Sequence, residues 1–466
     1  ENYQFALDND PNTKPSFFSN TVFDNQRYFQ KIIDRETNSR INLAHIVSDK
    51  FTLNYGYNGR VKTREFENIR YGYDFLTPRL EVDDITNLDA VFNLQNFGRL
   101  YNTEVFNSLS PGNLPTTNFP GANENTYTGE LKVNAGYVSA VYNLNEKWSF
   151  VPGIRLEAFN QEINYDVINI NPNDPRFREA TETFFLPSLN IKYALKENQN
   201  LRFTFSKSVS VPEFKEVAPF VYEAVGQRIG GNPDLLNDPS FSKVFNIDFK
   251  YEWFMTRDEL FSVSMFAKQI NNPVNLVIAN DATGTQRYFR TGDKAEVIGI
   301  ELEARKNLIK NEDDDTQLSA GFNVTYMHTE QDLYSNIDGQ LFDTSFNRPT
   351  DQLQGASPFL MNANINYSPT KWENYKPVAS LVFSYFSDRI DALGSGQIGN
   401  IIEKGVPTLD FIWKNKFGEN TELNLKAQNL LDPNITRVRE GTPIGDVTLS
   451  EFQIGMNISL SFKYNF

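Results

Sequence analysis

Side chains that could perform acid–base or metal chemistry are scarce in this sequence of 466 residues. It contains two histidines, His45 and His328, and no cysteine. A Ser-His-Asp triad would need one of these histidines, and neither lies in a nucleophile motif. Two isolated histidines make a poor zinc site, and the acidic run NEDDDT at 311–316 lacks the spacing and glycine of an EF-hand loop. We therefore expect no enzyme and no resident metal or cofactor.

Charged residues recur at every second position in several segments. In VIGIELEAR at 297–305, apolar and charged residues alternate, so a strand would place them on opposite faces. The charged face could be the solvated surface of a β-sandwich or the lining of a hydrated barrel lumen. The lumen-facing candidates are Arg155, Glu157, Lys192, Arg202, Asp248, Lys250, Glu301, Glu303 and Arg305.

The end of the chain shows the same alternation most clearly. In FQIGMNISLSFKYNF, residues 452–466, every second residue from Phe452 to Phe466 is apolar. Strands of soluble domains have about 5 to 6 residues, whereas a tilted strand that crosses a bilayer needs about 9 to 11. We therefore interpret this stretch as one membrane-spanning strand whose apolar face meets lipid and whose polar face meets a lumen.

The composition allows a membrane barrel and excludes a helical membrane protein. Hydrophobic residues make up 39 %, the mean hydropathy is -0.48, and no run approaches the roughly 18 apolar residues of a membrane helix. A barrel can be this hydrophilic because only alternate strand residues face lipid. The net charge of -15 disfavours nucleic acid, and we expect none as a partner.

Alternation and turn residues together predict strands that come in pairs. The links within pairs are short, as in NLNEK at 143–147, and the links between pairs are long and polar. This asymmetry is typical of an outer-membrane barrel, in which turns face the periplasm and loops face outward. The predicted pairs are 36–46 with 50–66, 130–142 with 147–159, 184–194 with 199–207, 241–253 with 259–270, 296–306 with 317–328, 358–367 with 377–385, and 408–416 with 420–428.

The tryptophans support this arrangement. All four fall near the short turns, and tryptophan concentrates at membrane interfaces where one edge of the ring stays hydrated. We therefore expect interface positions for Trp148, Trp253, Trp372 and Trp413.

Several ordered segments carry a family resemblance. A strand pair from 184 leads into Pro212-Glu213-Phe214 and then into GNPDL at 231–235. With the segments 51–75, 137–157, 291–308, 353–369, 425–432 and the terminal strand, this pattern resembles the β-barrel of TonB-dependent outer-membrane receptors over almost the whole chain. The resemblance implies that the last strand, with Leu460, Phe462, Tyr464 and Phe466, is the barrel assembly signal.

The resemblance also sets expectations about the rest of the molecule. The family has a 22-stranded barrel filled by an N-terminal plug, whereas this sequence offers about 16 strands and no plug. We expect an all-β, transmembrane, antiparallel up-and-down barrel over 1–466, with the plug and first strands upstream. Unpaired strand edges are not tolerated in lipid, so the missing strands should exist.

The implied function is uptake of a scarce solute across the bacterial outer membrane with energy from the TonB complex, acting through the plug. The solute could be a siderophore, haem, a vitamin, a glycan or a peptide. A lipoprotein or another outer-membrane protein is a further candidate partner. Binding residues are expected in the loops near 67–129, 208–240, 329–357 and 429–451. The alternatives are a complete passive porin of about 16 strands and a surface β-sheet adhesin.

Overall fold

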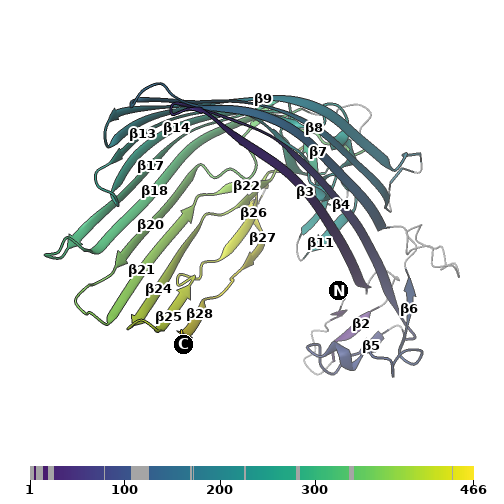
Figure 1. Ribbon diagram of the computed structural model, residues 1–466. Helices are drawn as coiled ribbons and strands as arrows, with labels where there is room; N and C mark the ends of the chain where they lie inside the picture. Colours follow the sequence, from purple (N-terminus) through teal and green to yellow (C-terminus); the bar gives the residue numbers. More distant parts are fainter. Residues whose placement is uncertain are drawn as a thin grey trace.

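The structure, a computed structural model, describes residues 5–6, 14–18, 26–77, 79–105, 125–167, 170–171, 173–224, 227–279, 284–334, 341–442 and 444–466. Its main feature is one curved antiparallel sheet, here called the wall (Figure 1). The long strands of the wall are β3 (Gln26–Ser48), β4 (Phe51–Phe75), β7 (Asn125–Asn143), β8 (Trp148–Val167), β9 (Phe177–Lys196), β10 (Gln199–Ser210), β13 (Ser242–Phe254), β14 (Leu260–Asn271), β17 (Lys294–Lys310), β18 (Thr316–Asp332), β20 (Phe359–Tyr367), β21 (Tyr375–Phe386), β24 (Val406–Phe417), β25 (Thr421–Gln428) and β28 (Asn457–Tyr464). Two short strands, β6 (Tyr101–Val105) and β19 (Thr350–Asp351), pair with β4 and β18.

The wall consists of hairpins, as the alternating sequence predicts. Each hairpin, from β3–β4 to β24–β25, closes with a link of two to seven residues, while the links between hairpins are longer. Because neighbouring strands are antiparallel, all short links lie at one end of the wall and all long links at the other. The prediction of an all-β antiparallel sheet with about 16 visible strands is confirmed.

Several strands are longer than predicted. β3 and β4 have 23 and 25 residues, whereas the sequence predicts 36–46 and 50–66. The extra length lies at the long-link end, where Lys31, Arg35 and Glu67 join the face that carries Ile41 and Leu43 nearer the short link. Cross-strand contacts such as the Arg64–Asp34 ion pair continue the ladder there, and such pairs stabilise a sheet without an apolar face.

The outer face of the wall carries exposed apolar residues toward the short links. Met265 on β14 pairs with Ile300 on β17, and both belong to the face that carries Ile298. Met265 is 58 % and Ile298 62 % exposed. Exposed apolar side chains on one face of neighbouring strands are typical of a membrane-spanning wall.

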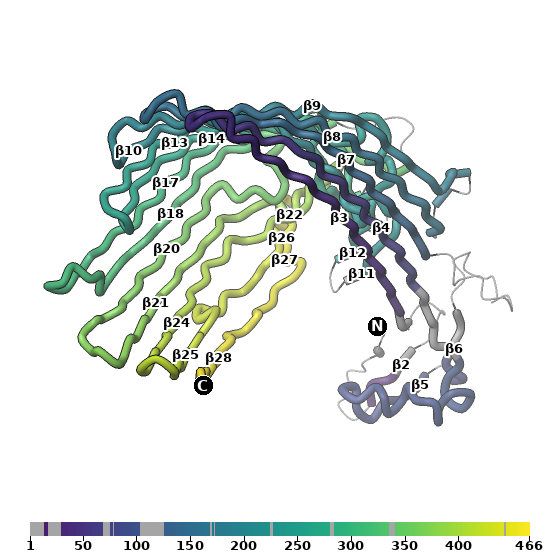
Figure 2. Tube along the Cα trace, in the orientation of Figure 1, coloured from purple at the N-terminus to yellow at the C-terminus, as the bar shows by residue number. Residues whose placement is uncertain are grey.

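The two ends of the wall are β3 and β28. Each strand of the wall pairs with its neighbours from β3 through to β28. In the described part of the chain, no backbone pairing joins β28 to β3. Figure 2 shows the two strands as separate edges of the wall. All eight residues of β28 are exposed, on both faces of the strand.

The last strand is interrupted, which corrects the prediction of one continuous strand from Phe452. Phe452 ends β27 (Gly445–Phe452), and β28 begins only at Asn457. Gly455 lies between them with φ +84°, a conformation that disfavours other residues. Its amide donates to Asp432 and its carbonyl accepts from Asn429, so this turn is held from the preceding link.

The long links contain structure of their own. One four-stranded sheet contains β11 (Val221–Ala224), β12 (Gln227–Gly230), β16 (Gln286–Arg290) and β15 (Val274–Ile278), and another contains β22 (Arg389–Ala392), β23 (Ile401–Glu403), β26 (Ile435–Thr442) and β27. A small sheet of β1 (Phe5–Ala6), β2 (Ser16–Phe18) and β5 (Arg79–Glu81) precedes the 3-10 helix η1 (Leu88–Ala90). Among the described residues, no helix has the length and apolar character needed to cross a membrane.

Candidate functional site

Three neighbouring rungs of the β3–β4–β7–β8 ladder gather polar side chains on the inner face of the wall. Residues directly opposite one another on antiparallel strands share a face, so the register alone sets this grouping. The rungs are Asn42, Gly56, Tyr137 and Arg155; Arg40, Asn58, Ala135 and Glu157; and Asn38, Arg60, Val133 and Phe159.

These rungs line a cavity of about 680 Å³, here called the arginine pocket. Its lining includes Arg40, Arg60 and Arg155, together with Val209, Ser210 and Val211. Arg155 donates to Glu157 through Nη2 at 2.8 Å and Nε at 3.0 Å. The pocket therefore carries three guanidinium groups and one carboxylate, and it has the volume of a small-molecule site.

The structure places the other charged candidates on the inner face as well, but not at this pocket. Lys192, Arg202 and Lys250 form one rung, and Arg202 pairs with Glu252 at 2.7 Å. The remaining candidates lie outside the four strands β3, β4, β7 and β8. Asp248 is on β13, and Glu301, Glu303 and Arg305 are on β17. Only Arg155 and Glu157 of the nine candidates line the arginine pocket, and contact with a lumen or plug stays a prediction for the rest.

The four tryptophans lie at the short-link end, as the sequence places them. Each is 37–45 % exposed, and Trp148 packs against Tyr193 with ring centroids 4.5 Å apart. Trp372 lies in the β20–β21 link and packs near Tyr375 at 5.4 Å. Trp253 and Trp413 lie in β13 and β24 close to the short links. Their role at a membrane interface stays a prediction.

The residues of the expected assembly signal are strongly exposed. Leu460, Phe462 and Tyr464 share the apolar face of β28 and are 70 %, 69 % and 48 % exposed. Phe466 follows the strand, and its ring packs near Tyr464 with centroids 5.1 Å apart. The use of these residues in barrel assembly stays a prediction.

A second functional feature is the link 211–241, here called the docked segment, which the structure describes except at 225–226. It contains the short helix α1 (Phe214–Val217) and the 3-10 helix η3 (Pro233–Leu236). Its apolar side chains join the inner face of β4, β7, β8 and β9 in the largest core of the described molecule. The sequence suggests a polar loop here, and the structure shows a segment folded against the wall.

Phe214 anchors the docked segment to the wall. Its ring is 2 % exposed and covers Gly129 on β7, where a Cβ atom would lie 2.5 Å from the ring. Lys62 and Arg64 flank the ring at 5.7 and 5.8 Å from its centroid, within range of a cation–π interaction. Lys62 Nζ also donates to Glu213 at 3.2 Å. Glycine at 129 is therefore what allows this close approach.

We predict that Gly129→Ala loosens the docked segment. The added methyl group must displace a ring that is already buried, and overpacking of this kind costs about 1–3 kcal/mol. Faster hydrogen exchange of the α1 amides would report the loss. Gly136→Ala on the same strand is the matched control, because nothing lies within 4 Å of its Cβ position. Equal exchange in both variants would contradict the prediction.

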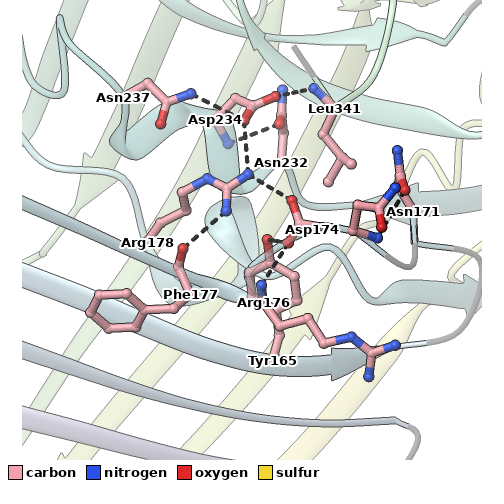
Figure 3. A network of polar contacts seen from close by, with 11 residues as sticks. Tyr165, Asn171, Asp174, Arg176, Phe177, Arg178, Asn232, Asp234, Asn237 and Leu341 are labelled. Atoms are coloured by element: carbon pink, nitrogen blue, oxygen red, sulfur yellow. Dashed lines mark hydrogen bonds and ion pairs between the residues drawn. The ribbon is translucent and has the colours of Figure 1, made fainter. Parts of the chain in front are cut away.

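A network of buried polar contacts holds the docked segment at η3 (Figure 3). The Arg178 guanidinium lies between Asp174, at 2.8 Å, and Asp234, at 3.6 Å. Tyr165 donates to Asp174 at 2.7 Å, and the Leu341 amide donates to Asp234. Burial opposes ionisation of Asp174, but the hydrogen bonds from Arg178 and Tyr165 outweigh it and lower the pKa of Asp174. The network joins three links that are distant in sequence.

Two arginines of β16 hold the docked segment from the opposite side. Arg290 donates to the carbonyl oxygens of Leu235 at 3.0 Å, Asn272 at 2.8 Å and Ser240. Burial lowers the pKa of Arg290 to about 10, which leaves it charged at neutral pH. Arg287 donates to the carbonyl oxygen of Gly231 at 3.1 Å, and its Cζ atom lies 3.7 Å from the centroid of the Phe342 ring. β16 is thereby tied to the docked segment.

Sequence reasoning missed Arg40, Arg60 and the anchoring role of Phe214. The alternation of Arg60, Lys62 and Arg64 was a usable signal, because strand periodicity places all three on one face. Of the loops expected to bind a solute, 208–240 is buried at 212, 214, 217–220 and 230–236. The expected loops also include positions outside the described residues, namely 78, 106–124, 225–226, 335–340 and 443.

Solved structures with the same fold are receptors and transporters. The unliganded ferric citrate transporter FecA matches with a TM-score of 0.57 and 13 % identity, over 97 % of this chain and 57 % of that one. The copper transporter OprC matches with a TM-score of 0.60 and 12 % identity, over 94 % and 58 %. The siderophore receptor PiuA from Acinetobacter baumannii matches with 0.57 and 12 %, over 94 % and 56 %.

The chain thus spans less than two thirds of the length of these proteins, and identities this low establish the fold alone. No curated protein sequence matches it. The family model described as "TonB dependent receptor-like, beta-barrel" matches residues 1–430. The chain therefore belongs to the TonB-dependent receptor β-barrel family.

Proposed function

We propose that this chain forms the barrel wall of a bacterial outer-membrane transporter, which takes up a scarce external solute with energy from the TonB complex. The observation that carries the proposal is a polar pocket inside a wall whose outer face is apolar. Family membership supports it, and so do solved proteins of the same fold that are described as transporters or receptors of ferric citrate, copper and a siderophore.

The docked segment argues against the alternative of an open passive porin. It places Phe214, Val217 and Leu235 against the inner face of the wall, where they are at most 2 % exposed. A segment fixed in this way occupies lumen volume that a passive channel would leave to water. A gated receptor, by contrast, benefits from a fixed surface behind its binding site.

The proposal predicts uptake that depends on both this gene and the TonB complex. Strains with the gene, without it, and with the gene but a disrupted TonB complex are grown in one medium, and solute depletion is followed by mass spectrometry. We expect at least one solute to be depleted only by the first strain. Depletion that needs the gene but not the TonB complex would instead identify a passive porin.

We further propose that additional strands lie between β28 and β3 and that a plug fills the lumen. Unpaired backbone groups at a sheet edge are costly in lipid, and both edges of the wall lie next to apolar outer faces. Intact mass and peptide mapping of the protein from native membranes test this. A mass well above 53.4 kDa with upstream peptides supports the proposal, whereas a mass of 53.4 kDa refutes it.

A further inference from the structure

Basic side chains on the inner face of β3 and β4 differ in whether they have an acidic partner. Toward the long-link end, Asp34 lies opposite Arg64 and Glu36 lies opposite Lys62. Arg64 and Asp34 form a two-pronged ion pair with distances of 2.6 and 2.7 Å, and Lys62 reaches Glu213 on the docked segment. Each of these bases therefore has an acid of the same protein as its partner.

The next two rungs lack such partners. Arg60 lies opposite Asn38, and Arg40 lies opposite Asn58. Within the described ranges, neither arginine is within ion-pair distance of a carboxylate, and both are exposed to the arginine pocket. Arg155 and Glu157 complete the charged lining, so the formal charge of the pocket is +2 in a chain whose net charge is −15.

We propose that the arginine pocket binds a carboxylate or phosphate group of the transported solute through Arg40 and Arg60, beside the Arg155–Glu157 pair. This assignment of a substrate class rests on the proposed transport function. A guanidinium group presents paired donors that match an oxyanion, and it stays charged at any physiological pH. Arg40 and Arg60 are free to turn their donors inward because no acid of the described chain engages them.

The remaining lining suits a solute with both polar and apolar parts. Asn38 and Asn58 lie beside the arginines. The Asn38 amide donates to Glu36 at 2.8 Å, and Arg155 Nη1 lies 3.1 Å from the Asn58 side-chain oxygen in the amide orientation that satisfies both groups. Val133 and Phe159 supply an apolar floor, and both are 6 % exposed. The oxyanion would bind at the guanidinium groups and the carbon skeleton would lie on this floor.

The test measures anion binding by the full native receptor, purified in detergent. Isothermal titration uses pyrophosphate and propane-1,2,3-tricarboxylate as probes and sucrose as the uncharged control. We expect Arg40→Gln/Arg60→Gln to bind both anions at least tenfold more weakly than the unmodified receptor. Raising the salt concentration should weaken binding to the unmodified receptor, because screening acts on this charged pocket. Arg305→Gln is the matched control, an inner-face arginine outside the pocket.

Two results would overturn the inference. One is binding of both anions by the double variant as tightly as by the unmodified receptor. The other is no binding by the unmodified receptor together with a lower thermal midpoint of the double variant, which would assign the arginines to an acidic segment of the receptor itself. TonB-dependent uptake is measured separately in cells, so its persistence in either case would leave the transport function standing and refute only the anion site.

Discussion

Replacing Asp234 with alanine is expected to free the far end of the docked segment. The change leaves the Leu341 amide and the Asn237 side chain without their acceptor and removes one of the two carboxylates beside Arg178. Breaking a buried polar cluster of this kind costs about 3 kcal/mol, which corresponds to about 100-fold faster local opening. Hydrogen exchange of peptides that cover η3, followed by mass spectrometry, measures this rate.

An exposed ion pair of the same region provides the control. Asp166 pairs with Arg176, and both side chains are more than 40 % exposed. Surface pairs contribute at most about 1 kcal/mol, so Asp166→Ala should change exchange of η3 by less than about fivefold. If Asp234→Ala exchanged no faster than Asp166→Ala, the buried network would not be what holds the segment.

Phe214→Ala should accelerate hydrogen exchange of α1 more than Asp234→Ala does. The ring is buried between Gly129, Lys62 and Arg64, and truncation of a buried phenylalanine costs about 3–5 kcal/mol. We expect exchange of the amides of α1 to accelerate by at least 100-fold while the amides of β7 and β8 keep their protection. The wall is stabilised by its own ladders and does not depend on this ring.

The double variant Gly129→Ala/Phe214→Ala isolates the contact between these residues. The methyl group at 129 clashes only with the Phe214 ring among its nearest neighbours, so its cost should vanish once the ring is gone. A coupling of about 1–3 kcal/mol between the two substitutions is therefore expected. Additive effects would show that Gly129 has another role.

The sequence predicts the strands well because strand periodicity and turn residues are local. Alternation in VIGIELEAR and the short turn at 143–147 identify their strands without any knowledge of the partners. Strand ends are predicted less well, since β4 continues to Phe75 through residues that pair first with β3 and then with β6, and this pairing is not a local property. Gly455 breaks the terminal alternation for a similar reason, through contacts with Asp432 and Asn429.

The pocket could not be predicted because it depends on register. Arg40 and Arg155 are 115 positions apart, and only the pairing of β3 with β4, β4 with β7 and β7 with β8 brings their rungs together. The same holds for Phe214 and Gly129. Their contact requires a link to turn inward, and the local sequence of Pro212-Glu213-Phe214 does not specify that direction.

The docked segment also has a consequence for the order of folding. The hairpins close over links of two to seven residues, so they can form early and independently. Phe214, however, can bury its ring only after β7 has presented Gly129 from 85 positions earlier, beside the side chains of β4. Protection of α1 should therefore appear only after β4 and β7 have paired, which makes burial of this single ring a late marker that the wall has reached its correct register.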